Sequence, residues 1–474
     1  MSTKPFYVAG EWRTGEGTLD VHSPYDGSVV ATIGVPTDGD VEDAVVAAAE
    51  TFKESRHLPT YARAEALMHI SRRIAERVDE LAEAVAREGG KPLKWSNVEV
   101  TRAVSTFRWA AEEARRFGGE FLALDTEQYL GSRAGIIRRF AYGPVLGISP
   151  FNFPVNLVAH KVAPALAVGA PIVIKPAGVT PLGALALAEL FDETDLPKGM
   201  LSVLPISGER AQKLVEDRRF KKLSFTGSGI GWKLKGLDPK KHATLELGGN
   251  AGVIVHSDAD LDHAAQRVAV GGNYQAGQSC ISVQRVFVQS EVFDDFVTRL
   301  VKQVESLKVG DPLDPNVDVG PVIDEGAAER IEEWVNEAVE QGARLLTGGT
   351  RNGSMYQPTV LTDVTPDMKV CKEEVFGPVV TVERYQTYQE AIDMVNDSPY
   401  GLQAGVFTRD IERAMLAHRE IEVGGVIVND VSAFRADQMP YGGSKESGYG
   451  REGLRYAMDE MTEPRIMVLS HVSL

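Results

Sequence analysis

The stretch Leu245-Glu246-Leu247-Gly248-Gly249-Asn250 separates two series of strand-like segments along the chain. In the first series, helical patterns alternate with short apolar runs at residues 145–149, 171–175, 201–205, 223–226 and 244–247. In the second series, they alternate with runs at residues 252–255, 285–289, 359–361, 379–382, 404–407 and 425–428. Strands that alternate with helices are typical of a parallel, doubly wound sheet. The sequence therefore predicts two α/β domains that meet near Gly248-Gly249.

The segments on either side of these series have other patterns. Residues 1–35 alternate apolar runs with turn signals and predict short strands. Spacings of three and four between apolar residues predict helices over 41–53, 61–88 and 95–117. We expect Asp40 to cap the first of these helices, and Thr180 to cap a helix that has Pro181 at its first position. Residues 120–142 alternate in polarity, which predicts a hairpin that extends from the body.

Composition limits the classes of function. The chain has 474 residues, enough for two or three domains, and a net charge of -17 opposes binding to nucleic acid or to an anionic membrane. The first eight residues carry no signal-peptide core, and no apolar run approaches the ~20 residues that span a bilayer. The cysteines, Cys280 and Cys371, form neither a disulfide framework nor a metal-binding pattern. We expect a cytoplasmic enzyme that acts on a small molecule and holds no metal.

Glu246 and Cys280 carry the most informative chemistry. A carboxylate that accepts a proton and a thiol that attacks carbon are the two groups that covalent catalysis on a carbonyl requires. Each residue alone also has an ordinary explanation, because a free cysteine is often a small buried hydrophobe and an isolated glutamate is often a solvated charge. The domain boundary at Gly248-Gly249 would place the two residues on opposite walls of one cleft, where active sites commonly lie.

Seven motifs distributed over most of the chain resemble those of the aldehyde dehydrogenase superfamily and occur in the same order. They are Pro150-Phe151-Asn152-Phe153-Pro154, Lys175-Pro176-Ala177-Gly178, Phe225-Thr226-Gly227-Ser228, Glu246-Leu247-Gly248-Gly249-Asn250, Gly277-Gln278-Ser279-Cys280, Glu373-Glu374-Val375-Phe376-Gly377-Pro378 and Pro440-Tyr441-Gly442-Gly443. One such match would carry little weight, whereas seven in order are specific. The resemblance implies NAD(P)-dependent oxidation of an aldehyde to a carboxylic acid.

The resemblance also implies an organisation in three parts. A Rossmann-like dinucleotide-binding domain would comprise residues 1–120 and 142–248, and a catalytic α/β domain would comprise residues 249–459. A small β oligomerisation domain would comprise residues 121–141 and 460–474, because family members associate through such a hairpin and the C-terminal strand. We therefore expect a homodimer or a homotetramer.

The implied mechanism assigns roles to four side chains. Cys280 attacks the aldehyde carbonyl as a thiolate, forming a thiohemiacetal and then, after hydride loss, a thioester. Asn152 donates its amide to the oxyanion together with the backbone N–H of Cys280. Glu246 is the general base and activates the water that releases the acid; relatives that pass the acyl group to coenzyme A tend to lack this residue. Glu452 matches a carboxylate that serves either in a proton relay or in holding its loop.

The cofactor site depends mostly on the resemblance. Gly227-Ser228-Gly229-Ile230-Gly231 follows a strand-like run, but its spacing is not G-x-G-x-x-G, so alone it is equally consistent with an ordinary turn. The resemblance implies that the dinucleotide contacts Ile148, Ser149, Pro150, Phe151, Lys175, Gly178, Gly208, Gly227, Ser228, Leu247, Glu374 and Phe376. Members that prefer NAD often carry Glu where this chain has Gly178, so the lack of this carboxylate favours the use of NADP. The sequence shows no evident arginine pair that would bind a 2'-phosphate, and on balance it favours NAD slightly.

Two positions bear on the aldehyde. His160 follows Asn152 by two helical turns, and Arg435 precedes the Pro440-Tyr441-Gly442-Gly443 motif. Together they could bind an anionic tail such as phosphonate, phosphate, sulfonate or carboxylate. At these places the chain resembles members that act on phosphonoacetaldehyde, lactaldehyde or glyceraldehyde 3-phosphate, although Ser279 stands where some anion-selective members have Arg. The alternative is that both residues have structural roles.

Two other functions remain open from the sequence. A catalytically retired family member could act as a binding or structural protein, although such a protein is expected to lose Cys280, Glu246 or Asn152. A thiol hydrolase would pair the cysteine with a histidine, and no histidine lies in such a motif.

Overall fold

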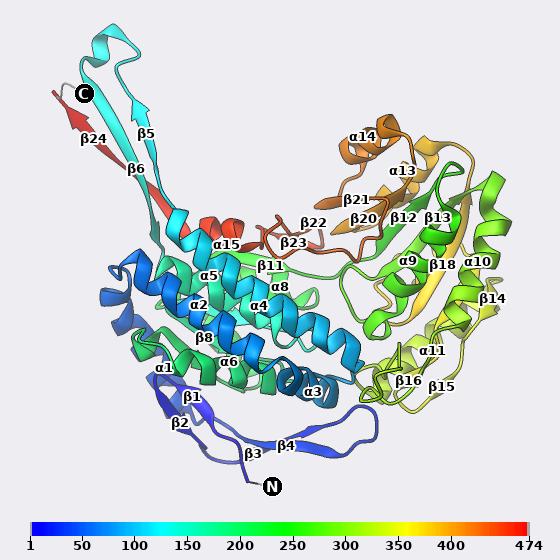
Figure 1. The fold of residues 1–474 in the computed structure, drawn as a ribbon, viewed down its shortest axis with the longest axis horizontal. Helices are drawn as coiled ribbons and strands as arrows, with labels where there is room; N and C mark the ends of the chain where they lie inside the picture. Colours follow the sequence, from blue (N-terminus) through cyan, green and yellow to red (C-terminus); the bar gives the residue numbers. More distant parts are fainter. Residues whose placement is uncertain (1, 472–474) are drawn as a thin grey trace.

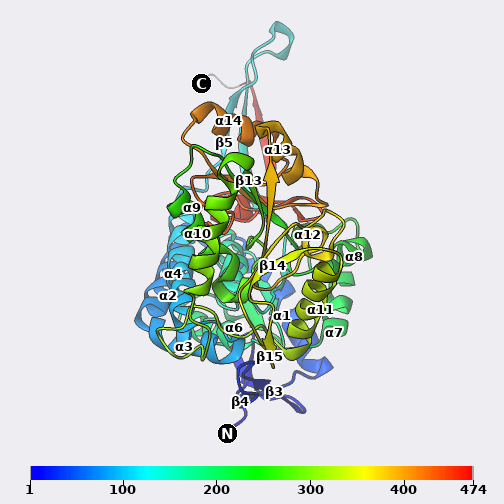
Figure 2. The same ribbon diagram turned by 90° about the vertical axis from the view of Figure 1, so that its right-hand side faces the viewer.

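The computed structural model describes residues 2–471 and contains two lobes, each built on its own sheet, and a thin arm (Figure 1). The N-terminal half of the chain forms one lobe and most of the C-terminal half forms the other. A view turned by 90° shows the arm at one end and the N-terminal strands at the other (Figure 2). This mixture of parallel sheets and covering helices confirms the predicted α/β fold class.

The sheet of the first lobe follows the order β2-β1-β9-β8-β7-β10-β11-β23. Its strands are β2 (Glu11–Arg13), β1 (Phe6–Val8), β9 (Leu201–Val203), β8 (Ile172–Lys175), β7 (Val145–Ile148), β10 (Lys222–Thr226), β11 (His242–Glu246) and β23 (Gly448–Tyr449). The strands from β9 to β11 run parallel. At the edges, β1 pairs antiparallel with β9, β2 pairs antiparallel with β1, and β23 pairs antiparallel with β11. A hairpin of β3 (Thr18–His22) and β4 (Val29–Gly34) lies beside this lobe near the N-terminus (Figure 1).

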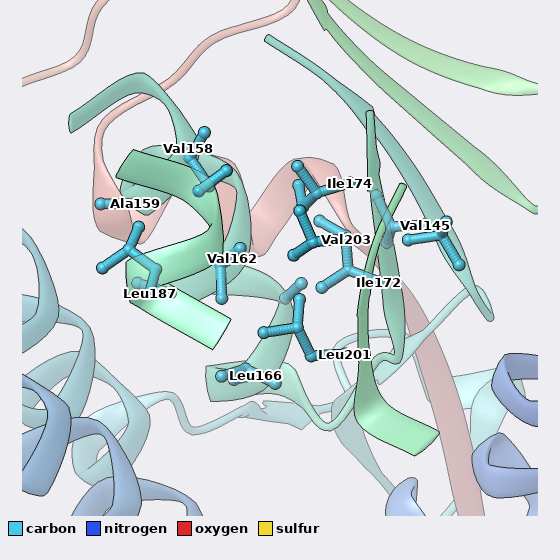
Figure 3. Packing of buried hydrophobic residues seen from close by; sticks show 14 of the residues in the cluster. Val145, Val158, Ala159, Val162, Leu166, Ile172, Ile174, Leu187, Leu201 and Val203 are labelled. Atoms are coloured by element: carbon cyan, nitrogen blue, oxygen red, sulfur yellow. The ribbon is translucent and has the colours of Figure 1, made fainter. Parts of the chain in front are cut away.

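Helices cover this sheet because its central strands are apolar on both faces. The helices of this lobe are α1 (Asp38–Ser55), α2 (Thr60–Glu76), α3 (Val78–Gly89), α4 (Leu93–Arg116), α5 (Asn156–Val168), α6 (Leu182–Asp192), α7 (Gly208–Glu216) and α8 (Ile230–Leu237). Figure 3 shows Val158 and Val162 of α5 and Leu187 of α6 facing Ile174 and Val203 of the sheet. Every residue of α5 is buried, so this helix is enclosed between the sheet and its neighbours.

Three local predictions in this lobe are wrong. Thr37, not Asp40, caps α1; Asp40 is the third helical residue and completes a reciprocal capping box with Thr37. Thr180 does not cap α6, because the N–H groups of Leu182 and Gly183 donate to the Glu88 carboxylate from α3. The helix predicted over 61–88 is two helices, α2 and α3, separated at Arg77.

The sheet of the second lobe follows the order β14-β17-β18-β13-β12-β20-β21, with only β14 antiparallel to its neighbour. Its strands are β14 (Arg344–Thr347), β17 (Thr359–Thr362), β18 (Val379–Tyr385), β13 (Val283–Gln289), β12 (Ala251–Val255), β20 (Gln403–Phe407) and β21 (Gly425–Val428). Its main helices are α9 (Leu261–Asn273), α10 (Phe293–Glu305), α11 (Glu325–Glu340), α13 (Tyr388–Asn396) and α14 (Ile411–Glu420).

Shorter elements connect these strands and helices. They are η1 (Gln128–Leu130), η2 (Lys198–Met200), η3 (Tyr274–Gly277), η4 (Ser290–Val292), α12 (Lys369–Lys372), β15 (Arg351–Asn352), β16 (Met355–Tyr356), β19 (Tyr400–Gly401) and β22 (Ser444–Lys445). Within residues 2–471, every helix is too short or too polar to cross a bilayer.

The arm is a sheet in the order β24-β6-β5. It pairs β5 (Glu120–Ala123) and β24 (Thr462–Ser470) with the two sides of β6 (Arg133–Ala141), so the predicted hairpin forms and takes up the C-terminal segment. Phe121, Ile466, Met467 and Val468 are about half exposed on it. The arm projects away from both lobes (Figure 1), so these exposed apolar side chains lie outside the body of the protein.

After β21 the chain returns from the second lobe to the first, a path that the sequence did not indicate. Tyr441 and Glu452 form an isolated antiparallel bridge, and β23 then pairs with β11 at Leu245 and Glu246. The following helix, α15 (Leu454–Glu460), packs against α5 and α4. This return segment, residues 429–453, brings the Pro440-Tyr441-Gly442-Gly443 motif to the junction of the lobes.

Candidate active site

Cys280 follows a strained loop at the junction of the two lobes. Gln275, Ala276 and Gly277 have φ values of 51°, 52° and 69°, a region that residues with a side chain rarely adopt. A Cβ atom on Gly277 would lie 2.0 Å from the carbonyl oxygen of Gly377, so this position has room only for glycine. The loop thereby lies against the motif that carries Glu374, and the Cys280 side chain that follows it is half-buried.

The thiol reaches a cavity of about 250 Å³. Aromatic side chains form part of its wall, and the Cys280 side chain lies among them. Three guanidinium groups complete the wall: Arg102 from α4, Arg267 from α9 and Arg435 from the return segment. The cavity therefore combines a thiol, apolar walls and an excess of positively charged side chains.

The Cys280 sulfur lies 3.0 Å from the hydroxyl oxygen of Tyr441. Burial raises the pKa of the thiol to about 12, and the carboxyl groups of Glu374 and Glu246 add to the increase. The hydrogen bond with Tyr441 and the charge of Arg435 act in the opposite direction. At neutral pH the thiol is protonated in this state, so its attack on carbon requires a base.

Glu246 is the last residue of β11, and its side chain is enclosed. Within the described chain, neither of its carboxyl oxygens has a hydrogen-bond partner. Burial, together with the negative charge of Glu452, raises the pKa of Glu246 well above its ordinary value. A Cβ atom on Gly442 would lie 3.0 Å from a Glu246 oxygen, so Glu246 and Cys280 approach consecutive residues of the return segment, Gly442 and Tyr441.

Glu452 lies beside Glu246 but has charged partners. Its oxygens are 3.1 Å from the Lys161 ammonium and 3.0 Å from the Arg435 guanidinium, and all three side chains are buried. Burial alone would raise the pKa of Glu452, but Lys161 and Arg435 outweigh it and hold the pKa at about 2. Glu452 is therefore a permanent anion that fixes Arg435 at the cavity wall.

Asn152 reaches the cysteine loop from the first lobe. Its side-chain amide donates to the Gln278 carbonyl at 3.0 Å, and its backbone carbonyl accepts from the side chain of Gln275. The amide nitrogen carries two hydrogens, so one remains for an oxyanion. The structure thus brings Asn152 and Cys280 to one loop.

The predicted cofactor residues gather at the carboxyl end of the first sheet. Parallel pairing aligns Ile148 with Lys175, and Thr226 with Glu246. Just beyond these strand ends lie the following predicted residues: Ser149, Pro150, Phe151, Gly178, Gly227, Ser228 and Leu247. Gly208 opens α7 at the end of β9, the strand next to β8, and is exposed.

Glu374 and Phe376 approach the same edge from the second lobe. A carboxyl oxygen of Glu374 accepts from the Gly249 N–H at 2.9 Å, and burial raises the pKa of Glu374 to about 7. The rings of Phe376 and Phe151 meet edge to face at 5.9 Å. These contacts join the two motifs across the lobe junction.

Of the two predicted substrate residues, only Arg435 reaches the cavity. His160 is enclosed behind the wall, where its Nε2 lies 2.9 Å from Asp437. Asp437 also accepts from Arg102 at 2.8 Å, so the histidine supports a cavity residue instead of lining the cavity. Arg102 and Arg267 were not singled out from the sequence, since no motif marks arginines that lie far apart on α4 and α9. Tyr441 was noted only as part of the Pro440-Tyr441-Gly442-Gly443 motif, without a role.

The comparisons with known proteins cover nearly all of the chain. Residues 12–467 match the aldehyde dehydrogenase family. A 3-sulfolactaldehyde dehydrogenase from Priestia megaterium is 47% identical over 466 residues, which are 98% of this chain and 97% of the relative. A lactaldehyde dehydrogenase from Methanocaldococcus jannaschii is 38% identical over 98% of this chain and 100% of its own length.

Solved structures agree closely with this fold. Aldehyde dehydrogenase 21 from Physcomitrella patens, in complex with the reaction product succinate, is 44% identical, with a TM-score of 0.98 over 100% of this chain and 99% of that chain. Glyceraldehyde-3-phosphate dehydrogenase GapN from Methanocaldococcus jannaschii, complexed with NADP, is 37% identical, with a TM-score of 0.91 over 95% of this chain and 99% of that chain.

Proposed function

The chain belongs to the aldehyde dehydrogenase family, and from this premise we propose that it oxidises a small aldehyde with an anionic tail to the carboxylic acid, using NAD or NADP. The observation that carries the proposal is the juxtaposition of the Cys280 thiol and three arginines around one cavity of about 250 Å³. The retention of Cys280, Glu246 and Asn152 argues against a retired enzyme.

The protein's own groups account for the covalent steps. The Cys280 sulfur bonds to the aldehyde carbon as the thiol proton passes to solvent water, and the carbonyl oxygen, now negatively charged, accepts hydrogen bonds from the free N–H of the Asn152 amide and from a backbone N–H. Loss of hydride from the carbon leaves a thioester on Cys280. Glu246 takes a proton from water, whose oxygen attacks the thioester, and the acid departs as the thiol is restored. The raised pKa of Glu246 makes its ionised form a stronger base than an ordinary carboxylate.

The residues at the edge of the first sheet fit a nicotinamide dinucleotide, which when bound supplies the hydride acceptor. The Ser149 hydroxyl is buried without a hydrogen-bond partner in the described chain. The Lys175 ammonium, whose pKa burial lowers, likewise has no ion pair or hydrogen bond within residues 2–471. A Cβ atom on Gly178 would meet only Leu19, at 3.7 Å, so space is available for either cofactor. Named neighbours with bound NADP support the use of NADP as well as NAD.

The anionic tail is inferred from the charges of the cavity wall. Arg102, Arg267 and Arg435 are held by Asp437, Asp430 and Glu452, respectively. The Nε–H groups of Arg102 and Arg435 are buried without an acceptor among the described residues. The carboxylate on the wall, Glu99, is already bonded to Lys91 and to backbone N–H groups. A sulfonate, carboxylate or phosphate would satisfy the remaining donors. The sulfolactaldehyde and succinate named for the relatives have such groups.

The test compares aldehydes that differ only in the tail. Sulfolactaldehyde is set against lactaldehyde, and 4-oxobutanoate against butanal, with NAD and with NADP. We expect kcat/KM to be on the order of 10² higher for the anionic member of each pair, since one or two charge-assisted hydrogen bonds contribute about 1.5–3 kcal/mol each. Arg102→Met should reduce the ratio within each pair. Equal kcat/KM for the charged and neutral aldehydes would contradict the proposal.

The arm supports a second part of the proposal, self-association. Among residues 2–471, no further strand pairs with the outer edges of β5 and β24, and Phe121, Ile466 and Met467 are about half exposed on this sheet. Such an edge favours pairing with another copy. We propose a homodimer or homotetramer, which sedimentation equilibrium would distinguish.

A further inference from the structure

We propose that Tyr441 is a further catalytic residue: its hydroxyl donates a hydrogen bond to the Cys280 sulfur as that sulfur becomes a thiolate, and Arg435, stacked on its ring, strengthens the donor. The inference deepens the proposed function, since it rests on the nucleophilic role of Cys280. It assigns a task to a side chain that the motif comparison left without one.

Tyr441 is held in position by its surroundings. Its side chain is 3% exposed and packs with Ile281, Leu402 and Met439 beside Cys280. Its backbone exchanges hydrogen bonds with Glu452, from N–H to O at 3.0 Å and in return at 2.6 Å. The hydroxyl oxygen is thereby fixed 3.0 Å from the sulfur, within the range of a hydrogen bond that involves sulfur.

The chemistry of the pair indicates the direction of donation. Burial and the nearby Cys280 and Glu246 keep the pKa of Tyr441 well above its ordinary value, so the hydroxyl retains its proton at every pH at which the enzyme would act. A thiolate has no proton to donate and is an acceptor only. Ionisation of the sulfur therefore turns this contact into a charge-assisted hydrogen bond from Tyr441.

Arg435 adds positive charge to the donor. Its guanidinium carbon lies 3.7 Å from the centroid of the Tyr441 ring, and one of its nitrogens is 3.0 Å from Glu452. A cation over the ring face withdraws electron density and favours negative charge on the phenolic oxygen, which makes the O–H a better donor. Glu452 and Lys161 behind it keep the guanidinium in place.

The groups that face the thiol show why it needs this donor. Glu246 and Glu374 approach it from the two lobes and oppose ionisation, as burial does. The hydroxyl of Tyr274, another candidate on the wall, is bonded instead to Ser279, at 2.6 Å. Tyr441 and Arg435 favour ionisation, and both belong to the return segment. The geometry therefore assigns the stabilisation of the thiolate to that segment.

The test measures the thiolate directly, without an aldehyde or cofactor. Iodoacetamide, a small neutral reagent, alkylates the full-length protein between pH 7 and 10, and mass spectrometry follows the Cys280 peptide. We expect Tyr441→Phe to slow alkylation at each pH by roughly threefold to tenfold. The variant loses the hydrogen bond to the thiolate, which lowers the fraction of Cys280 that is ionised. A thiolate of higher pKa is more nucleophilic, which offsets part of this loss. Tyr356→Phe, at a buried tyrosine of the second lobe that lies outside the cavity, is the matched control, and its profile should coincide with that of the wild type.

Arg435 variants provide the second measurement. Arg435→Gln should slow alkylation in the same direction as Tyr441→Phe, and Arg435→Lys should restore part of the rate because it keeps the charge. An unchanged profile in a folded Tyr441→Phe protein, or an equal change in Tyr356→Phe, would overturn the inference. Steady-state oxidation by the Cys280→Ala variant tests the proposed function separately. Turnover by this variant would contradict the role of Cys280 as the nucleophile. An inactive Cys280→Ala variant together with an unchanged alkylation profile of Tyr441→Phe would contradict only the role of Tyr441.

Discussion

Glu246, at the end of β11, and Glu452, in the return segment, are neighbouring buried carboxyl groups with opposite pKa shifts. Their side chains are almost equally enclosed, at 1% and 2% exposure. Glu452 has Lys161 and Arg435 within 3.1 Å, and its pKa falls to about 2. Glu246 has no hydrogen-bond partner in the described chain, and its pKa rises well above the ordinary value.

The difference shows that two equally buried carboxyl groups can have opposite pKa shifts, depending on whether cationic side chains form ion pairs with them. Glu452 stays ionised and serves as a fixed charge that orders Arg435. Glu246 keeps its proton to a higher pH than an ordinary carboxyl group, because it is buried and because the permanent anion next to it opposes a second negative charge. Two carboxyl groups whose environments move their pKa values apart can divide the tasks of anchor and base.

The largest effect should separate the two carboxyl groups by their role in the reaction. Glu246→Gln removes the base, so steady-state turnover should fall by about 10²–10⁴-fold while an initial burst of NAD(P)H remains, because acylation precedes the step that needs this base. Stopped-flow absorbance measures the burst and the rate that follows. Undiminished turnover in Glu246→Gln would contradict the assignment of the base.

The second effect concerns stability and the partners of Glu452. Lys161→Met leaves a buried carboxylate with one of its two cations, which should lower the free energy of unfolding by about 3–5 kcal/mol. Urea denaturation measures the loss. The double variant Lys161→Met/Glu452→Gln should be less destabilised than the sum of the single variants, because the charges are removed together. Strict additivity would mean that the ion pair does not couple the two residues.

The smallest effect is a shift in the pH profile of thioester hydrolysis. Hydrolysis requires ionised Glu246, so its rate falls as pH falls through the raised pKa of this group. Glu452→Gln removes the negative charge that raises that pKa, and the acid limb should move to lower pH. Single-turnover hydrolysis rates across pH 5 to 9 give the position of the limb. A limb that moves to higher pH would show that loss of the contact with Arg435 outweighs the charge.

Much of the fold could be predicted because its signals are local. Parallel strands buried on both faces read as continuous apolar runs, and the observed β7, β8, β12 and β20 lie within one residue of the predicted segments. The hairpin of the arm was predicted from alternation alone. The errors at Asp40 and Thr180 also have a local cause, since several nearby residues can cap a helix and only packing selects one. Glu88, which satisfies the start of α6, comes from 94 positions earlier in the chain.

The residues of the candidate site also fall into two groups, those that a local motif identifies and those that only tertiary contacts identify. Cys280, Glu246 and Asn152 stand in motifs whose order along the chain identifies them. Arg102, Arg267 and Tyr441 could not be assigned, because their roles depend on contacts between α4, α9 and the return segment. His160 was placed on the correct helix, but the salt bridge between Asp437 and Arg102 decides what it contacts.

The sequence by itself determined which reaction chemistry the chain carries, because a nucleophile, a base and an amide donor are residue types that motifs specify. Only the tertiary structure decided how each group behaves. The pKa of a carboxyl or thiol group depends on the charges within a few ångströms, and here those charges come from segments far apart in the sequence. The fold gave Glu452 two ion-pair partners, left the Glu246 carboxyl oxygens without a hydrogen-bond partner among the described residues, and placed the hydroxyl of Tyr441 beside the sulfur of Cys280.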